Sequence, residues 1–210
     1  MGKIFLKVMF IKFKILFIFF FINNIALSND IREFEIGMNV EDLPKTGYIE
    51  IKCLNALKVL KVWQDYKKCE PSENNLFYIT FQYDDKYAFN ENFEGTQIAG
   101  HPVVINIGIK KNGILQEINV TTDDKAPFYF KKQAHLFWVR ILSKYGSEAW
   151  QCKEYKKKNN HIIINKKYVN KSCFKNLKNK KISYHTQLFF IGNKEKDSLV
   201  SKTLMSISLI

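Results

Sequence analysis

The chain has 210 residues, of which 46% are hydrophobic, 15% aromatic and 25% charged, and its formal net charge is +13. A composition this apolar excludes an intrinsically disordered protein, and the length suits a single domain with a substantial hydrophobic core. The positive charge is concentrated, because eleven lysines and a single acid, Glu154, fall between residues 153 and 181.

The first 28 residues have the pattern of an export signal. Four lysines precede the unbroken apolar run from Ile15 to Ile22, and Ala26 and Ser28 are the small residues that a signal peptidase reads. This pattern predicts cleavage between Ser28 and Asn29. An uncleaved anchor is the alternative, but eight apolar residues fall short of the ~20 that span a bilayer. We therefore expect residues 29–210 to form one periplasmic or secreted domain, with a net charge of +9.

Two strands are expected in the first part of this domain. Asn39 is a good N-cap for one helical turn, after which residues 48–52 alternate as a strand does. Residues 76–83 are rich in β-branched and aromatic side chains and predict a second strand. Between the two strands, residues 54–67 carry apolar side chains at helical spacing, so a helix is expected between Cys53 and Cys69.

The clearest structural signal is a hairpin around Asn112-Gly113. Alternating residues at 103–109 and 115–121 flank this dipeptide, which is the strongest short hairpin signal. We expect a two-residue turn with one buried and one wet face. The predicted pairs are Ile109 with Gln116, Ile107 with Ile118, Ile105 with Val120 and Asn106 with Asn119.

A long helix is expected after the hairpin, over about 126–145. Asp123 and Asp124 offer N-caps, Gly146 is a C-terminal stop, and an apolar stripe recurs at helical spacing. Further strands are expected at 150–152, 161–165, 182–191 and 203–209. The predicted fold class is α+β: an antiparallel sheet with one long helix packed on it and two disulfides, preceded by the cleaved signal.

All four cysteines lie after the signal, and an even number in an exported protein predicts two disulfides. Proximity favours Cys53 with Cys69 and Cys152 with Cys173, although three connectivities are possible. A straight helix over 54–67 is in tension with this pairing, because it would separate Cys53 and Cys69 by ~24 Å, whereas a disulfide needs Cα atoms within ~7 Å. Zinc-ligand spacings such as C-x-x-C are absent from the sequence, so we predict no metal or cofactor.

Signals for catalysis are weak. His101, in a Gly-His-Pro turn, is a candidate general base with Asp84 or Asp85 as its partner, and Glu91 with Glu94 is a candidate acid pair. Together they define an alternative function, a hydrolase of envelope material. A histidine that makes one structural hydrogen bond is the simpler interpretation of His101.

The lysine-rich segment 153–181 is the strongest functional hint. Its aromatic and lysine side chains are suited to an anionic membrane surface or envelope polymer, and the candidate residues are Lys156, Lys157, Lys158, Lys166 and Lys167. The alternative is a solvated face whose Lys/Asn excess reflects an AT-rich coding sequence. We predict a non-enzymatic, envelope-associated binding or assembly factor, with a protein partner possible and no nucleic-acid partner.

Overall fold

Residues 29–56, 58–84 and 96–210 are described in the computed structural model of the protein. The expected signal peptide and Asp85, Glu91 and Glu94 lie outside these residues. In the described ranges, no helix is long and apolar enough to cross a membrane.

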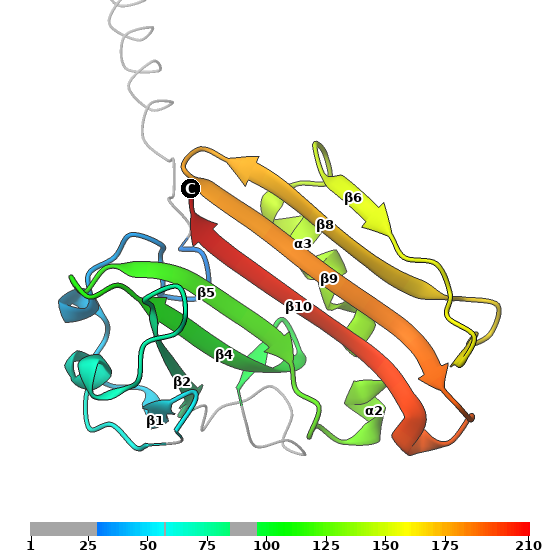
Figure 1. The fold of residues 1–210 in the computed structure, drawn as a ribbon, viewed down its shortest axis with the longest axis horizontal. Coiled ribbons are helices and arrows are strands. Elements are labelled where there is room, and N and C mark those ends of the chain that lie inside the picture. The colour runs from blue at the N-terminus through cyan, green and yellow to red at the C-terminus, as the bar shows by residue number, and fades with distance from the viewer. Residues whose placement is uncertain (1–28, 57, 85–95) are drawn as a thin grey trace, which may run out of the picture.

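An antiparallel sheet dominates the fold (Figure 1). The strand order is β1-β2-β4-β5-β10-β9-β8-β6, with β3 paired to β4 and β7 paired to β9. The strands are β1 (Tyr48–Cys53), β2 (Phe77–Tyr83), β3 (Gln97–Ile98), β4 (His101–Ile109), β5 (Leu115–Thr122), β6 (Gln151–Glu154), β7 (His161–Ile162), β8 (Val169–Leu177), β9 (Lys180–Ile191) and β10 (Leu199–Leu209).

The two faces of the sheet differ in chemistry because side chains alternate along each strand. One row of residues faces the core, and its members lie opposite one another across five strands with no exposed surface: Ile79, Ile107, Ile118, Ile207 and Ile182. The neighbouring row points to the other face and is polar: Thr80, Asn106, Asn119, Ser206 and Ser183. The core therefore lies on one side of the sheet.

Two parts of the chain cover the apolar face. At the β1–β2 end, Phe34 and Trp63 pack on Phe81, with ring centroids 5.1 and 5.0 Å from it. At the β9–β10 end, Phe137 and Ile141 of the helical segment are buried in the same core. Figure 1 shows this helical segment behind the sheet.

The body of the β4–β5 hairpin has the predicted register. Ile107 lies opposite Ile118, and Asn106 lies opposite Asn119 on the polar face. The assignment of core and wet faces in this hairpin is therefore confirmed.

The turn of this hairpin differs from the prediction. The N–H of Gly113 donates to the carbonyl of Lys110 at 2.9 Å, and Gly113 has a φ of +88°. This is the geometry of a three-residue loop that ends in a left-handed glycine. Ile109 consequently lies opposite Leu115, and the predicted pair of Ile109 with Gln116 was wrong. Gln116 is the extra residue of a bulge, which restores the predicted register beyond it.

The predicted single helix over 126–145 was also wrong, and with it the fold class of a sheet with one long helix. The segment forms α2 (Phe128–Lys131), a 3₁₀ turn η3 (Ala134–Leu136) and α3 (Phe137–Tyr145). Strands make up 46% of the described residues and helical residues 16%. The protein is therefore mainly an antiparallel β-sheet with short helical segments on one face.

Buried hydroxyl groups of the sheet explain the break in this helix. The Thr203 hydroxyl lies 3.1 and 3.2 Å from the carbonyls of Ala134 and His135 and shares its one hydrogen between them, and the Thr186 hydroxyl donates to the carbonyl of His135 at 2.9 Å. Both threonines are fully buried on the core face. A carbonyl released from the helical pattern needs a partner, and these threonines supply one where the chain changes direction.

The helix expected over 54–67 is reduced to a 3₁₀ segment, η2 (Trp63–Lys68). The preceding residues instead return along β1, where the N–H of Cys53 donates to the carbonyl of Lys58 at 2.8 Å. This reversal lets Cys53 bond to Cys69 with Cα atoms 5.4 Å apart. The second disulfide joins Cys152 to Cys173, so both predicted pairs are present.

Candidate functional site

Two loops bring the five candidate lysines together. Lys156, Lys157 and Lys158 follow β6, whereas Lys166 and Lys167 belong to the turn between β7 and β8, and all five are exposed. We call these five residues the lysine corner.

The turn that carries Lys166 and Lys167 is tight. The backbones of Ile164 and Lys167 exchange two hydrogen bonds, at 3.0 and 2.7 Å. Asn165 and Lys166 both have positive φ, at 46° and 64°, as a two-residue hairpin turn requires. Asparagine tolerates this conformation well, so the local sequence explains why the two lysines lie at a turn tip.

Aromatic side chains tie the two loops to each other. The His161 ring stacks on Phe189 with centroids 3.9 Å apart, and His161 Nδ1 lies 3.1 Å from the Tyr168 hydroxyl. That hydroxyl donates to the carbonyl of Lys156 at 3.3 Å. Desolvation lowers the pKa of His161 from its usual value, and nearby Lys158 lowers this pKa further. A neutral imidazole therefore supports the cluster without adding to its charge.

Among the described residues, no carboxylate neutralises the positive charge of the lysine corner through an ion pair. None of its five ammonium groups lies within ion-pair distance of a described carboxylate. The loop between β9 and β10 adjoins the corner, because the N–H of Gly192 donates to the carbonyl of Asn160 at 2.8 Å. This loop adds Lys194 and Lys196 but also two acids, Glu195 and Asp197.

Other lysines of the 153–181 segment have structural contacts. Lys171 lies 4.6 Å from the ring centroid of Trp138. Lys175 donates to the carbonyl of Tyr145 at the end of α3, where a cation complements the helix dipole. Lys180 pairs with Asp30 at 2.8 Å. The segment is therefore not one continuous cationic surface, and only part of its charge is free to meet a partner.

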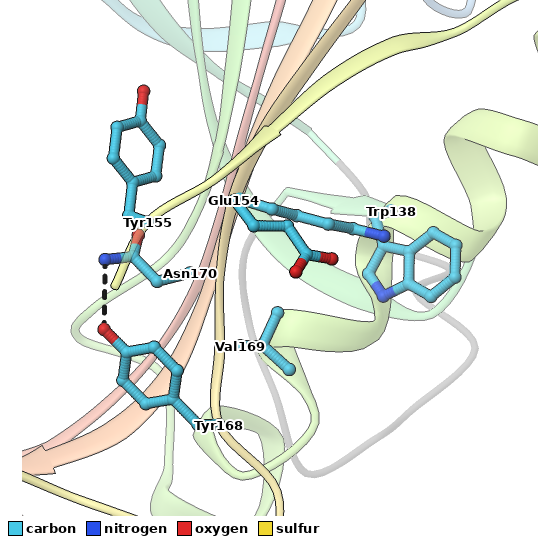
Figure 2. Close-up of a pocket in the computed structure, with 7 residues that line it drawn as sticks. Trp138, Glu154, Tyr155, Tyr168, Val169 and Asn170 are labelled. Carbon is cyan, nitrogen blue, oxygen red and sulfur yellow. Dashed lines mark hydrogen bonds between the residues drawn. The ribbon is translucent and has the colours of Figure 1, made fainter. Parts of the chain in front are cut away.

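The sequence analysis did not identify a small pocket beside the lysine corner. Its volume is about 180 Å³, and Figure 2 shows Trp138 from α3 and Glu154 from β6 on its walls. Ligand pockets usually measure at least about 300 Å³, so this one suits a single side chain or a small group. The full lining is Trp138, Glu154, Tyr155, Tyr168, Val169, Asn170 and Lys171. Only the aromatic residues within the lysine-rich segment hinted at it.

His101 does not lie at an open catalytic site. Its ring lies 5.5 Å from that of Phe137, and the cavity beside it leaves no volume that a water molecule can enter. Burial lowers the pKa of His101, and Arg140 lowers it further. Asp84 lies at the end of β2, where its N–H donates to Gly47. The described carboxylates thus give no support to the hydrolase alternative.

Within the described ranges, no group of three or more histidine, cysteine or acidic side chains is arranged to hold a metal ion. Comparison of the chain with protein-family models, curated proteins and solved structures finds no match. The case for a function therefore rests on the geometry of the chain itself.

Proposed function

We propose that the protein is an exported, non-enzymatic binding protein that attaches to an anionic surface of the cell envelope through the lysine corner. The observation that supports this most strongly is that five exposed lysines lie on two loops that contact each other through the Tyr168 hydroxyl and the carbonyl of Lys156. The two disulfides fit an oxidising compartment.

Lipid headgroups and phosphorylated envelope polymers both carry negatively charged phosphate groups, which the lysine corner is suited to bind. A cationic residue close to an anionic membrane contributes about 1 kcal/mol, so five lysines are enough for reversible attachment. Exposed charges are screened beyond a Debye length of about 8 Å at physiological ionic strength. Attachment should therefore be steeply salt-dependent.

The test is retention of the purified protein on phosphatidylglycerol vesicles, phosphatidylcholine vesicles and immobilised lipopolysaccharide at low and high salt. Replacing Lys156, Lys157, Lys158, Lys166 and Lys167 with glutamine should weaken retention on at least one of the two anionic supports. The loss should approach about fivefold for each lysine near the surface, which corresponds to about 1 kcal/mol. Binding to vesicles alone would identify lipid as the partner, and binding to lipopolysaccharide alone would identify the polymer.

A matched control removes the same charge from lysines outside the corner. These exposed residues are Lys45, Lys58, Lys61, Lys110 and Lys111. Their replacement by glutamine should reduce retention much less, because they belong to other loops of the molecule. Equal retention of the corner variant and the parent at low salt would refute the proposal. Equal losses of retention for the two variants would show that retention depends only on the net charge of the protein.

A further inference from the structure

The two edges of the sheet differ in how their outer backbone groups are paired. At the β1 edge the chain folds back on itself: Leu60 donates its N–H to the carbonyl of Ile51 at 2.8 Å. At the other edge, β8 is the only strand among the described residues that pairs with β6, and all four residues of β6 are exposed. An unpaired edge is a template for another strand.

The alternation of the ladder shows which backbone groups point outward. The N–H of Tyr155 donates to the carbonyl of Asn170 at 2.8 Å, so the N–H of Lys153, two residues earlier, also faces β8. The N–H and carbonyl groups of Cys152 and Glu154 consequently point away from the sheet. They are available to an added strand.

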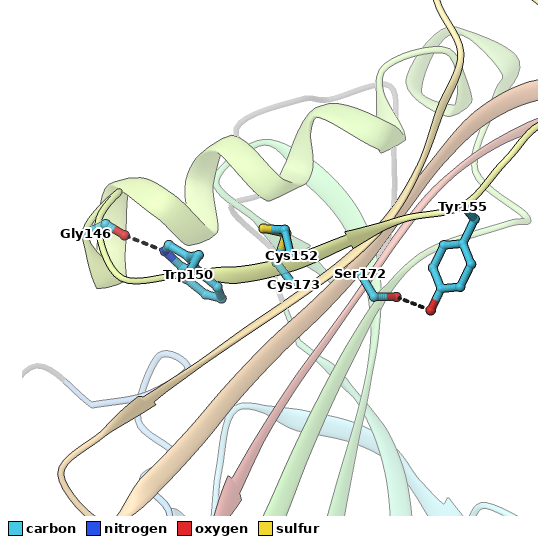
Figure 3. Close-up of a disulfide and its surroundings, with 6 residues drawn as sticks. All are labelled: Gly146, Trp150, Cys152, Tyr155, Ser172 and Cys173. Atoms are coloured by element: carbon cyan, nitrogen blue, oxygen red, sulfur yellow. Dashed lines mark hydrogen bonds between the residues drawn. A yellow bond between two sulfur atoms is a disulfide. The ribbon is translucent and has the colours of Figure 1, made fainter.

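This edge is held in place at both ends and in the middle (Figure 3). Trp150 Nε1 donates to the carbonyl of Gly146 at 2.8 Å, and the Tyr155 hydroxyl donates to Ser172 at 3.3 Å. Between them, Cys152 is bonded to Cys173. A preorganised edge loses little conformational entropy when a partner binds.

The positive charge around β6 favours an acidic partner segment over a second copy of the chain. A second copy of the chain, paired antiparallel about Lys153, would bring two Lys153 side chains opposite each other. Like charges that lie directly opposite are destabilising. An acidic segment would instead meet Lys153 and the lysines at 156–158.

We infer that β6 binds an extended acidic peptide segment of a partner protein by strand addition. The partner's backbone pairs with Cys152 and Glu154, its acidic side chains meet Lys153 and Lys156, and an apolar side chain enters the pocket beside Trp138, which opens at the Glu154 end of β6. Backbone pairing of this kind supplies affinity, and pockets for alternate side chains supply specificity.

The experiment uses three synthetic peptides of equal length and fluorescence anisotropy with the disulfide-bonded protein. One peptide alternates glutamate and valine, a second alternates lysine and valine, and a third has the first composition with a central proline in place of one valine. The first should bind. The second should not, and the third should bind about tenfold more weakly, because proline removes a ladder donor. Equal binding of the first and third peptides would overturn the inference.

A substitution in β6 tests the same backbone pairing through the protein instead of the peptide. Glu154→Pro removes an outward N–H and should lower the affinity of the protein for the first peptide about tenfold. Glu154→Gln should leave this affinity unchanged. The proline peptide keeps the test decisive if Glu154→Pro does not fold. Dimerisation of the parent that Glu154→Pro abolishes would overturn the inference in favour of a second copy. The inference goes beyond the proposed function, because vesicle retention needs lysines but no free edge and should be the same in Glu154→Pro as in Glu154→Gln.

Discussion

Asp30 fixes the start of the described chain to two separate elements. Its carboxylate is 4% exposed, accepts the N–H of Ile36 at 2.9 Å and pairs with Lys180 of β9 at 2.8 Å. Its carbonyl accepts the hydroxyl of Tyr145 from α3 at 3.0 Å. The predicted cleavage between Ser28 and Asn29 would leave all of these contacts intact.

Replacing Lys180 with methionine should lower the free energy of unfolding by about 2 kcal/mol. A fully buried pair costs about 3–5 kcal/mol when one partner is removed, and the loss here is smaller because the Lys180 side chain is 17% exposed. Urea unfolding measures the change. The double variant Asp30→Asn with Lys180→Met should be more stable than Lys180→Met alone, since it leaves no buried unpaired carboxylate at the site. Glu35, the other partner of Lys180 at 3.2 Å, is exposed enough to be hydrated. A single variant as stable as the parent would show that the ion pair contributes nothing.

At the scale of elements, β10 and β9 determine where the helical segment breaks. Thr203 and Thr186 place hydroxyls under the carbonyls of Ala134 and His135, so the segment is anchored to the sheet through polar contacts in a region that is otherwise apolar. The Ser201 side chain extends this set, because it accepts the N–H of His135 at 3.2 Å. Together these contacts position α3 and therefore Trp138.

Replacing Thr203 with valine should lower the free energy of unfolding by about 1 kcal/mol. The side chain keeps its size but loses its hydroxyl contacts to the carbonyls of Ala134 and His135. These carbonyls keep the N–H of Phe137 and the Thr186 hydroxyl as donors, so the cost is that of one net buried hydrogen bond. Thr121→Val is the matched control, because Thr121 lies on the polar face and should change stability by less than about 0.5 kcal/mol. Chemical denaturation of both variants measures the difference. Equal stability of the two would mean that the hydroxyl contacts do not hold the segment.

Local signals in the sequence predicted the hairpin body, the disulfide pairs and most strands, because each depends on residues close together in the chain. The break in the helix was not predictable in this way, since its cause is Thr203 and Thr186, which are more than fifty residues away along the chain. Strand β8 was missed because its lysines and asparagines suggested a solvated segment. Lys171 and Lys175 instead lie on its core-facing side, where their ammonium groups lie over the rings of Trp138 and Trp150.

For the candidate site, the sequence identified the five lysines but not their arrangement. Their convergence depends on Tyr168 and His161, which act across loops, and on the register of β8 with β9. The pocket beside Trp138 requires α3 and β6 to lie next to each other. Contacts of this kind depend on the tertiary structure and leave no periodic pattern in the chain.

At the scale of the whole molecule, stability should be greatest between about pH 7 and pH 10. The pKa values of His101, His135, His161 and His185 are all lowered, in each case mainly by desolvation. The unfolded chain, with a histidine pKa near 6.5, therefore takes up protons before the folded one does. Stability contributed by the neutral histidines is complete above about pH 6.5 and is lost as the pH falls towards their folded-state values.

At alkaline pH the stability is limited by tyrosines, whose pKa values are shifted upward. Burial raises the pKa values of Tyr48, Tyr78, Tyr145 and Tyr184 above the usual value of about 10. Their contribution is complete below about pH 10 and is lost as the pH rises through the folded-state values, because the unfolded chain then releases protons first. Melting temperatures measured from pH 5 to pH 11 should form a plateau that falls at both ends. A melting temperature that is unchanged between pH 7 and pH 5, above the range in which carboxylates titrate, would contradict the assignment of four neutral histidines to the folded state.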